Sequence, residues 1–171
     1  MIPDEHICSA SQHISAHIAD SHELLQNVKT IALYAAYGPE VSLSTLHELL
    51  PGIRFVYPRC HPHHQLTFHH ISNPAELVSG IMNIPEPVLL KHQEVPIAQI
   101  DLILCPGLAF GMDGSRLGQG GGYYDRALAH FNAKTCGIAM NHQIKPSVPS
   151  DHHDSNMDYL ASETGVQATK Q

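Results

Sequence analysis

DLILCPGLAFGMDGSRLGQGGGYYDRAL, residues 101–128, carries the clearest structural signal in the chain. The run from Ile100 to Cys105, apolar except for Asp101, is typical of a buried strand. A loop with seven glycines between Gly107 and Gly122 follows it, and residues 122–131 then have helical spacing. A strand that leads through a glycine-rich loop into a helix offers backbone N–H groups and a positive helix end to a phosphate. The stretch therefore predicts a phosphate-binding site.

Alternating strand and helix signals surround this stretch. They predict an α/β fold in which a mostly parallel sheet is flanked by helices, in a single domain over residues 1–171. The spacing of Ile7, Ile14 and Ile18 is weakly helical and leaves open whether the first 20 residues cover the sheet or fray. Residues 165–171 are expected to form a disordered tail. The other expected strands are 29–36, 52–58, 66–71 and 134–140, and the other expected helices are 42–50 and 74–80.

Composition and charge exclude several classes of partner. The formal net charge of −7 argues against a nucleic-acid surface, because a phosphate backbone needs a basic face. No apolar run approaches the roughly 20 residues that span a bilayer, and the first residues lack a basic start followed by an apolar stretch, so we expect a cytoplasmic protein. The cysteines, Cys8, Cys60, Cys105 and Cys136, form no C-x-x-C pair and are expected to be reduced and mostly buried.

Charged side chains inside the glycine-rich stretch strengthen the phosphate interpretation. Arg116 precedes the last glycines, and Asp125 and Arg126 follow them. A guanidinium can pair bidentately with a phosphate, and a carboxylate in the first turn of the helix can hold Mg²⁺ against phosphate oxygens. The alternative is that Arg116 and Asp125 only pair with each other. The stretch matches neither the P-loop motif nor a clean G-x-G-x-x-G.

Several motifs in a fixed order resemble one known family. PGLAF at residues 106–110 and GSRLGQGGGYYDR at 114–126 are the most specific of these. Between Ile31 and Glu163 there are also YGPE at 37–40, YPR at 57–59, NIPEP at 83–87 and VPSDHHD at 148–154. Together they resemble the 5-formyltetrahydrofolate cyclo-ligase family, also called methenyltetrahydrofolate synthetase.

The resemblance implies a Rossmann-like α/β fold and an ATP- and Mg²⁺-dependent enzyme. Such an enzyme converts 5-formyltetrahydrofolate to 5,10-methenyltetrahydrofolate and releases ADP and phosphate. In this reaction the formyl oxygen takes the γ-phosphoryl group, N10 attacks the activated carbon, and phosphate leaves. The expected partners are therefore the small molecules ATP and 5-formyltetrahydrofolate, without nucleic acid or membrane, and monomer and dimer both stay open.

Roles for individual residues also come from the resemblance. Arg116 is expected to be catalytic, by stabilising the charge on the transferring group. Glu40, Tyr124 and Glu86 are expected to bind the folate substrate, although Glu40 after a Gly-Pro turn is alternatively a solvated side chain. Asp125 and Asp154 are the expected Mg²⁺ ligands. The residues expected to bind ATP are Gly114, Arg116, Leu117, Gly118, Gln119, Gly120, Gly121, Gly122, Tyr123 and Tyr124.

The sequence departs from the family in two places. Residues 1–28 are a variant segment, because they hold neither lysine nor arginine where relatives usually carry cations that reach the nucleotide. Gly111 stands where the family commonly has an acidic residue. The alternative function is a degenerate member that binds nucleotide or folate without turnover. The N-terminal histidines, His6, His13, His17 and His22, are the candidate replacement cations.

The remaining histidines suggest a competing role in metal binding. HPHH at residues 61–64 and the pairs at 69–70 and 152–153 contain the ligand type that transition metals prefer. A site requires three or four such ligands to converge in space. The favoured interpretation is that these histidines stay solvated.

Overall fold

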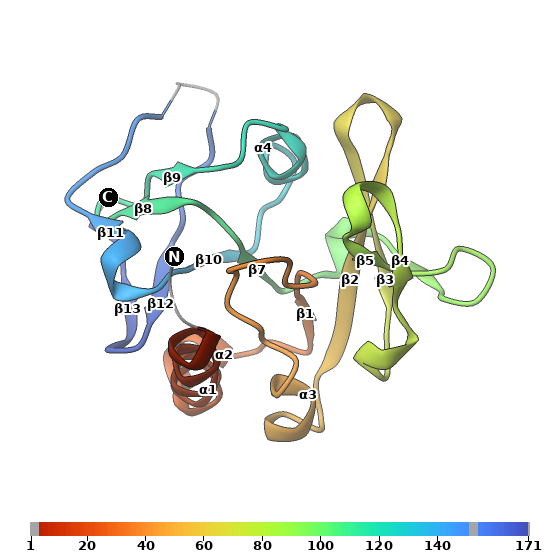
Figure 1. Cartoon of the computed structure of the whole chain (residues 1–171), viewed down its shortest axis with the longest axis horizontal. Helices are drawn as coiled ribbons and strands as arrows, with labels where there is room; N and C mark the ends of the chain where they lie inside the picture. The colour runs from red at the N-terminus through yellow and green to blue at the C-terminus, as the bar shows by residue number, and fades with distance from the viewer. Residues whose placement is uncertain (1–3, 151–153, 171) are drawn as a thin grey trace.

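The computed structural model describes residues 4–150 and 154–170, and its centre is an eight-stranded sheet (Figure 1). The strand order is β13-β12-β10-β7-β1-β2-β3-β6. The five strands from β12 to β2 run parallel, and β13, β3 and β6 pair antiparallel at the two edges. The prediction of a mostly parallel sheet in one α/β domain is confirmed. The bounds of these strands are β1 Thr30–Ala32, β2 Arg54–His61, β3 Gln65–His70, β6 Glu94–Val95, β7 Leu102–Cys105, β10 Lys134–Ile138, β12 Tyr159–Ser162 and β13 Gly165–Ala168.

Helices cover both faces of this sheet because its strands alternate side chains between two hydrophobic clusters. Leu102 and Leu104 of β7 join one cluster with Ile14 of α1, whereas Ile103 of the same strand joins the other with Leu128 of α4. α1 is thus folded onto the sheet and does not fray. The helices are α1 Asp4–Asp20, α2 His22–Leu25, α3 Leu46–Leu49 and α4 Tyr123–Leu128.

Two small sheets and short 3₁₀ turns complete the described structure. One small sheet is formed by β8 Ala109–Gly111, β9 Arg116–Leu117 and β11 Ile144–Lys145, and the other by β4 Val78–Ser79 and β5 Pro85–Glu86. The 3₁₀ turns lie at Pro62–His64, Pro74–Glu76, Ile81–Asn83, Ile97–Gln99 and Asn141–Gln143. No helix in the described ranges combines the length and the apolar character that crossing a bilayer requires.

The predicted disordered tail is wrong over residues 165–168, which form β13. This strand pairs antiparallel with β12, and Gly165 at the turn has a φ of +131°, a conformation that favours glycine. Thr169, the residue after β13, is also held in place, because its hydroxyl donates to the carbonyl of Met157 at 2.7 Å. Pairing to an edge strand satisfies the backbone groups of a segment too polar to be recognised as a strand by its hydrophobicity.

Other elements are shorter than the sequence predicted. Only Thr30–Ala32 of the expected strand 29–36 lies in the sheet, and Leu46–Leu49 is the helical part of 42–50. The expected helix at 74–80 is one 3₁₀ turn, Pro74–Glu76, followed by β4.

Of the cysteines, Cys105 and Cys136 are buried, Cys60 is intermediate and Cys8 is exposed, and all four are free thiols.

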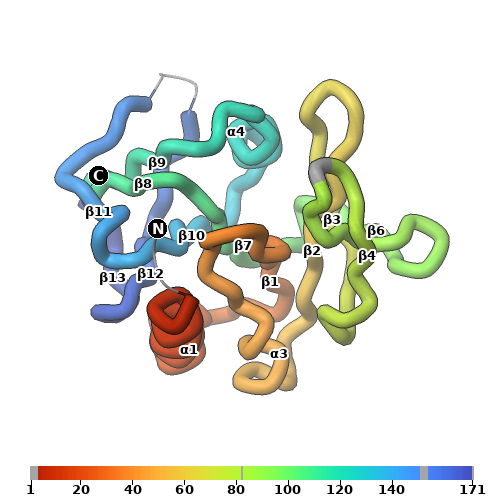
Figure 2. The backbone as a smooth tube through the Cα atoms, in the orientation of Figure 1, coloured from red at the N-terminus to blue at the C-terminus, as the bar shows by residue number. Residues whose placement is uncertain are grey.

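The side chain of Asp101 aligns the two central strands. One of its carboxylate oxygens accepts hydrogen bonds from the backbone N–H groups of Lys29 at 2.8 Å and Thr30 at 2.9 Å. This contact ties the start of β1 to the start of β7, so the two strands end side by side. Figure 2 shows the chain leaving β1 and looping through α3 before it enters β2.

Candidate active site

A pocket of about 350 Å³ lies where the central parallel strands end. Tyr34 and Glu40 reach it from the loop after β1, Pro106 and Gly107 from the loop after β7, and Cys60 from the end of β2. β1 and β7 are neighbours in the sheet. From β1 the chain continues to β2 on one side of this pair, and from β7 it continues to β10 on the other side. The carboxyl ends of strands at such a switch point are where open α/β sheets bind ligands.

The glycine-rich loop forms one wall of this pocket, with residues 118–122 all in its lining. Gly120 and Gly122 have φ values of +83° and +65°, which only glycine adopts at low cost. A Cβ on Gly118 would come within 3.0 Å of the Arg116 guanidinium. The loop therefore brings bare backbone close to both the pocket and the arginine.

Arg116 is the buried cation of the site, with 6% of its surface exposed. One guanidinium nitrogen donates to the carbonyl of Pro106 at 3.2 Å, and another donates to Asp125 Oδ1 at 2.5 Å. Its Cζ atom also lies over the Tyr124 ring, 5.6 Å from the ring centre. Its Nε is buried and has no hydrogen-bond partner within the described residues.

The pairing of Arg116 with Asp125, left open as an alternative from the sequence, is present in the structure. It does not remove either group from the site, because both side chains line the pocket. Mg²⁺ is commonly held by one or two carboxylates together with substrate phosphates. Asp125, with a third of its side chain exposed, fits that arrangement. Within residues 4–150 and 154–170, no three His, Cys, Asp or Glu side chains form a metal cluster of their own.

Two further carboxylates line the pocket. Glu86 is 1% exposed; its Oε1 accepts from the backbone of Cys60, and its Oε2 makes no hydrogen bond within the described residues but forms an ion pair with Arg59 Nη1 at 3.6 Å. Glu40 accepts from the backbone of Tyr37 at 2.9 Å and from the amide of Gln119 at 3.1 Å, which joins the β1 loop to the glycine-rich loop. Burial raises the pKa of the Glu40 carboxyl. Glu40 is thus a pocket residue and not a solvated turn residue.

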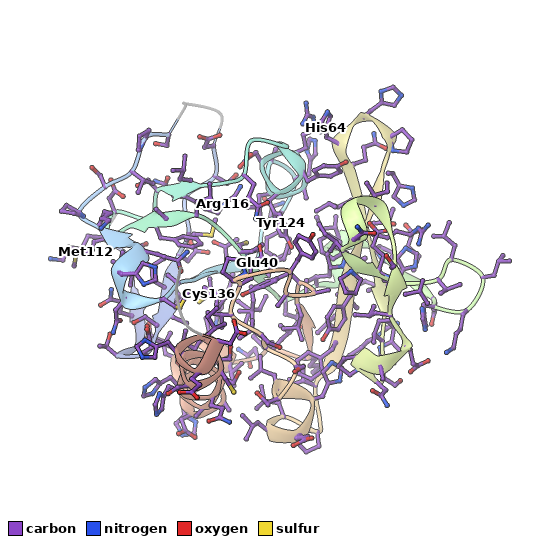
Figure 3. All side chains as sticks on the ribbon, in the orientation of Figure 1. Glu40, His64, Met112, Arg116, Tyr124 and Cys136 are labelled. Atoms are coloured by element: carbon purple, nitrogen blue, oxygen red, sulfur yellow. The ribbon has the colours of Figure 1, made fainter. Side chains whose placement is uncertain are left out.

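Burial also keeps the neighbouring hydroxyl and thiol groups neutral. It raises the pKa of Tyr34 and of Tyr124 well above the ordinary tyrosine value, and nearby Glu40 adds to both shifts. The pKa of Cys60 rises to about 11, first through burial and then through the charge of Glu86. Cys60 is therefore a neutral thiol near pH 7. Figure 3 shows Glu40, Arg116 and Tyr124 gathered between the β1 loop and α4.

Three predicted site residues do not line the pocket. Gly114 packs against the carbonyl of Met157 at a φ of +89°, so it serves a turn between β8 and β9. The carbonyl of Leu117 accepts from the backbone of Leu108, and its side chain is 38% exposed. Asp154 is also outside the pocket lining, and its neighbours 151–153, including His152 and His153, lie outside the described residues.

The variant N-terminal segment borders a second cavity of about 400 Å³. Asp4, Cys8 and Gln12 of α1 line it, opposite Gly38 and Ser42 of the β1 loop. None of the four N-terminal histidines lines this cavity or the pocket, so the expectation that they replace the missing cations is not supported by their positions.

At Gly111 a Cβ would collide with Asp113 and Ser115, whose side chains are hydrogen-bonded at 2.5 Å. Asp113 therefore supplies a carboxylate beside the position where the family commonly has one.

Several lining residues were not predicted as site residues from the sequence. They come from segments that the fold brings together, and the PGLAF, NIPEP, YPR and HPHH stretches contain some of them. These residues are Tyr34, Ala35, Pro58, Cys60, His64, Leu66, Ile81, Ile84, Pro106 and Gly107.

The parallel sheet, the glycine-rich loop and the buried arginine define an α/β protein with a pocket at the carboxyl ends of its central strands. Residues 1–163 match the model of the 5-formyltetrahydrofolate cyclo-ligase family, and the chain belongs to that family of enzymes. It is 32% identical over 152 residues to 5-formyltetrahydrofolate cyclo-ligase of Haemophilus influenzae, covering 85% of this chain and 81% of the relative. The Escherichia coli K12 relative of the same name is 32% identical over 132 residues, covering 73% and 72%.

Solved structures agree with this assignment. The 5,10-methenyltetrahydrofolate synthetase of Aquifex aeolicus superposes with a TM-score of 0.84 at 29% identity, over 100% of this chain and 86% of that one. The synthetase of Mycoplasma pneumoniae gives 0.76 at 25% identity, over 95% and 90%. The chain therefore shares both fold and family with these proteins.

Proposed function

We propose that the pocket catalyses the ATP- and Mg²⁺-dependent closure of 5-formyltetrahydrofolate to 5,10-methenyltetrahydrofolate, with release of ADP and phosphate. The observation that carries the proposal is a set of unsatisfied polar atoms. Arg116 Nε and the Tyr124 hydroxyl are buried without hydrogen-bond partners in the described residues, Glu86 Oε2 makes no hydrogen bond there beside its ion pair with Arg59, and all three residues line the pocket. Buried polar atoms are rarely left unpaired, so a bound ligand with both donors and acceptors is their natural partner.

The chemistry proceeds in two steps. The formyl oxygen attacks the γ-phosphorus of ATP and ADP leaves, so the formyl carbon becomes bonded to a phosphorylated oxygen. N10 then attacks that carbon and loses its proton, and the carbon–oxygen bond breaks as phosphate departs. Phosphoryl transfer of this kind depends on positioning and on charge neutralisation more than on a covalent nucleophile.

Each part of the pocket suits one task in this sequence. The backbone of residues 118–122 would cradle phosphate oxygens, and Arg116 would neutralise charge as the γ-phosphoryl group moves. Asp125 would hold Mg²⁺, which supplies further charge neutralisation when it is bound. Glu40 and Glu86 would accept hydrogen bonds from N–H groups of the pterin ring, while Ile81 and Ile84 limit access of water.

Spectroscopic detection of methenyltetrahydrofolate tests the proposal. We expect product from 5-formyltetrahydrofolate when ATP and Mg²⁺ are both present, and none when either is omitted. Calorimetric titration of the same preparation with each substrate is the control for a folded, binding-competent pocket. Binding of both substrates without product would contradict the proposal and identify a non-catalytic binding protein.

A further inference from the structure

The pocket contains little positive charge for an anionic substrate. Its lining has three carboxylates, on Glu40, Glu86 and Asp125, and one permanent cation, Arg116, which is paired with Asp125. Arg59 lies just outside the lining and is paired with Glu86 at 3.6 Å, so neither arginine is left unpaired for a substrate. The second cavity, beside α1, has Asp4 in its lining and no basic side chain. Among the residues that line the pocket, His64 is the one other side chain able to carry a positive charge near neutral pH.

His64 lines the pocket from a turn in which its backbone is left-handed. His63 and His64, at the tip of the β2–β3 hairpin, have φ values of +63° and +58°. This left-handed conformation is uncommon outside glycine, and residues held in it are concentrated at functional sites. Both residues are exposed, so core packing does not explain the turn.

One aromatic contact places the His64 ring at the mouth of the pocket. Its centre lies 5.2 Å from that of Tyr123, the first residue of α4, with the planes tilted by 60°. Figure 3 shows His64 on the hairpin side that faces α4. Tyr123 directly follows the glycine-rich loop, so the imidazole stands beside the wall expected to meet the substrate.

We propose that His64 binds an oxyanion of a substrate at the mouth of this pocket and does so as the imidazolium. The inference rests on the proposed function, which supplies two oxyanions, a phosphate of ATP and a carboxylate on the glutamate tail of 5-formyltetrahydrofolate. His64 would thereby supply part of the positive charge that residues 1–28 lack.

The sign of the pH effect follows from linkage. When an anion that prefers the imidazolium binds, the protein takes up a proton. The affinity for that anion therefore rises as pH falls through the range where histidine titrates. Other titratable groups face the same pocket or lie on the same hairpin and contribute to any pH profile. They are Tyr34, Glu40, Arg54, Tyr57, Arg59, Cys60, His61, His63, His69, His70, Glu86, Arg116, Tyr123, Tyr124 and Asp125.

Three variants separate His64 from these neighbours. His64→Asn removes the charge with a residue that tolerates the left-handed turn, and His64→Lys makes the charge permanent. His63→Asn is the matched control, because His63 shares the turn but does not line the pocket. Circular dichroism and thermal unfolding establish that each variant is folded.

The test is calorimetric titration at pH 6 and pH 8, in two buffers with different ionisation enthalpies so that proton uptake is measured. ATP, 5-formyltetrahydrofolate and 5-formyltetrahydropteroate, which lacks the glutamate, are titrated separately. For the compound that His64 contacts, we expect about 10-fold tighter binding at pH 6 in the wild type and in His63→Asn. This gain, and its proton uptake, should disappear in His64→Asn, and His64→Lys should bind tightly at both pH values.

The three titrations identify the oxyanion. A His64-dependent effect with ATP alone points to phosphate, and an effect with the glutamate-containing folate but not with the pteroate points to the carboxylate. The same pH dependence in wild type and His64→Asn for all three compounds would overturn the inference. Turnover is measured separately, so an inactive protein with His64-dependent binding would contradict the proposed function and leave this inference standing.

Discussion

Replacing Arg116 by alanine is expected to lower kcat by about 100-fold or more, with little change in KM for ATP. The charge that its guanidinium would neutralise grows as the γ-phosphoryl group moves, and an interaction stronger in the transition state lowers the barrier more than it tightens binding. Arg116→Lys should recover only part of the loss, because an ammonium cannot reproduce the fork that contacts Pro106 and Asp125. Steady-state kinetics of both variants measure kcat and the KM for ATP.

The control for this prediction is Arg126→Gln. Arg126 lies on α4 next to Asp125, is exposed, and donates to the carbonyl of Gly122 without lining the pocket. Thermal unfolding shows whether Arg116→Ala is folded, since the substitution leaves Asp125 without its partner. A folded Arg116→Ala variant with near-normal kcat and a raised KM would assign Arg116 to ground-state binding instead.

Replacing Gly121 by valine is expected to weaken ATP binding by at least 10-fold while leaving the sheet folded. A Cβ at this position would lie 3.0 Å from the Tyr123 ring, and the added methyl groups would occupy space beside the loop backbone. Close approach of a phosphate to backbone N–H groups needs that space. Calorimetry with ATP and a thermal unfolding curve are the two measurements.

Gly52→Val is the matched substitution for this test. Gly52 precedes β2, lies outside the pocket, and has no atom within 4 Å of the position that a Cβ would take. It should bind ATP as the wild type does. Unchanged ATP affinity in a folded Gly121→Val variant would remove the glycine-rich loop from the nucleotide site.

The part of the site that could be predicted from the sequence is the part encoded locally. The apolar run before Cys105, the glycines and the helical spacing after Gly122 are contiguous, and each has a short-range physical meaning. The strand and α4 were therefore predicted within a few residues of their bounds, whereas β8 and β9, which lie inside the expected loop, were not predicted. Arg116 and Asp125 followed because they lie inside the same stretch.

The remainder of the site depends on contacts between distant segments. Periodicity alone could not show that the chain leaves the sheet after Ala32, because Tyr34 remains buried and apolar while it lines the pocket. The turn at His63 and His64 contains no glycine or asparagine to signal its positive φ values. β13 is stabilised by pairing with β12, which a polar sequence does not reveal.

The measurement that tests the central claim most directly is transfer of ¹⁸O from the formyl group of labelled 5-formyltetrahydrofolate. If the pocket activates the formyl oxygen by phosphoryl transfer, each turnover should place one ¹⁸O in the inorganic phosphate as methenyltetrahydrofolate forms. Mass spectrometry of the phosphate gives the answer, with Arg116→Ala as the slow control. Phosphate that stays unlabelled while product accumulates would show that the formyl oxygen never received the phosphoryl group, and would contradict the account.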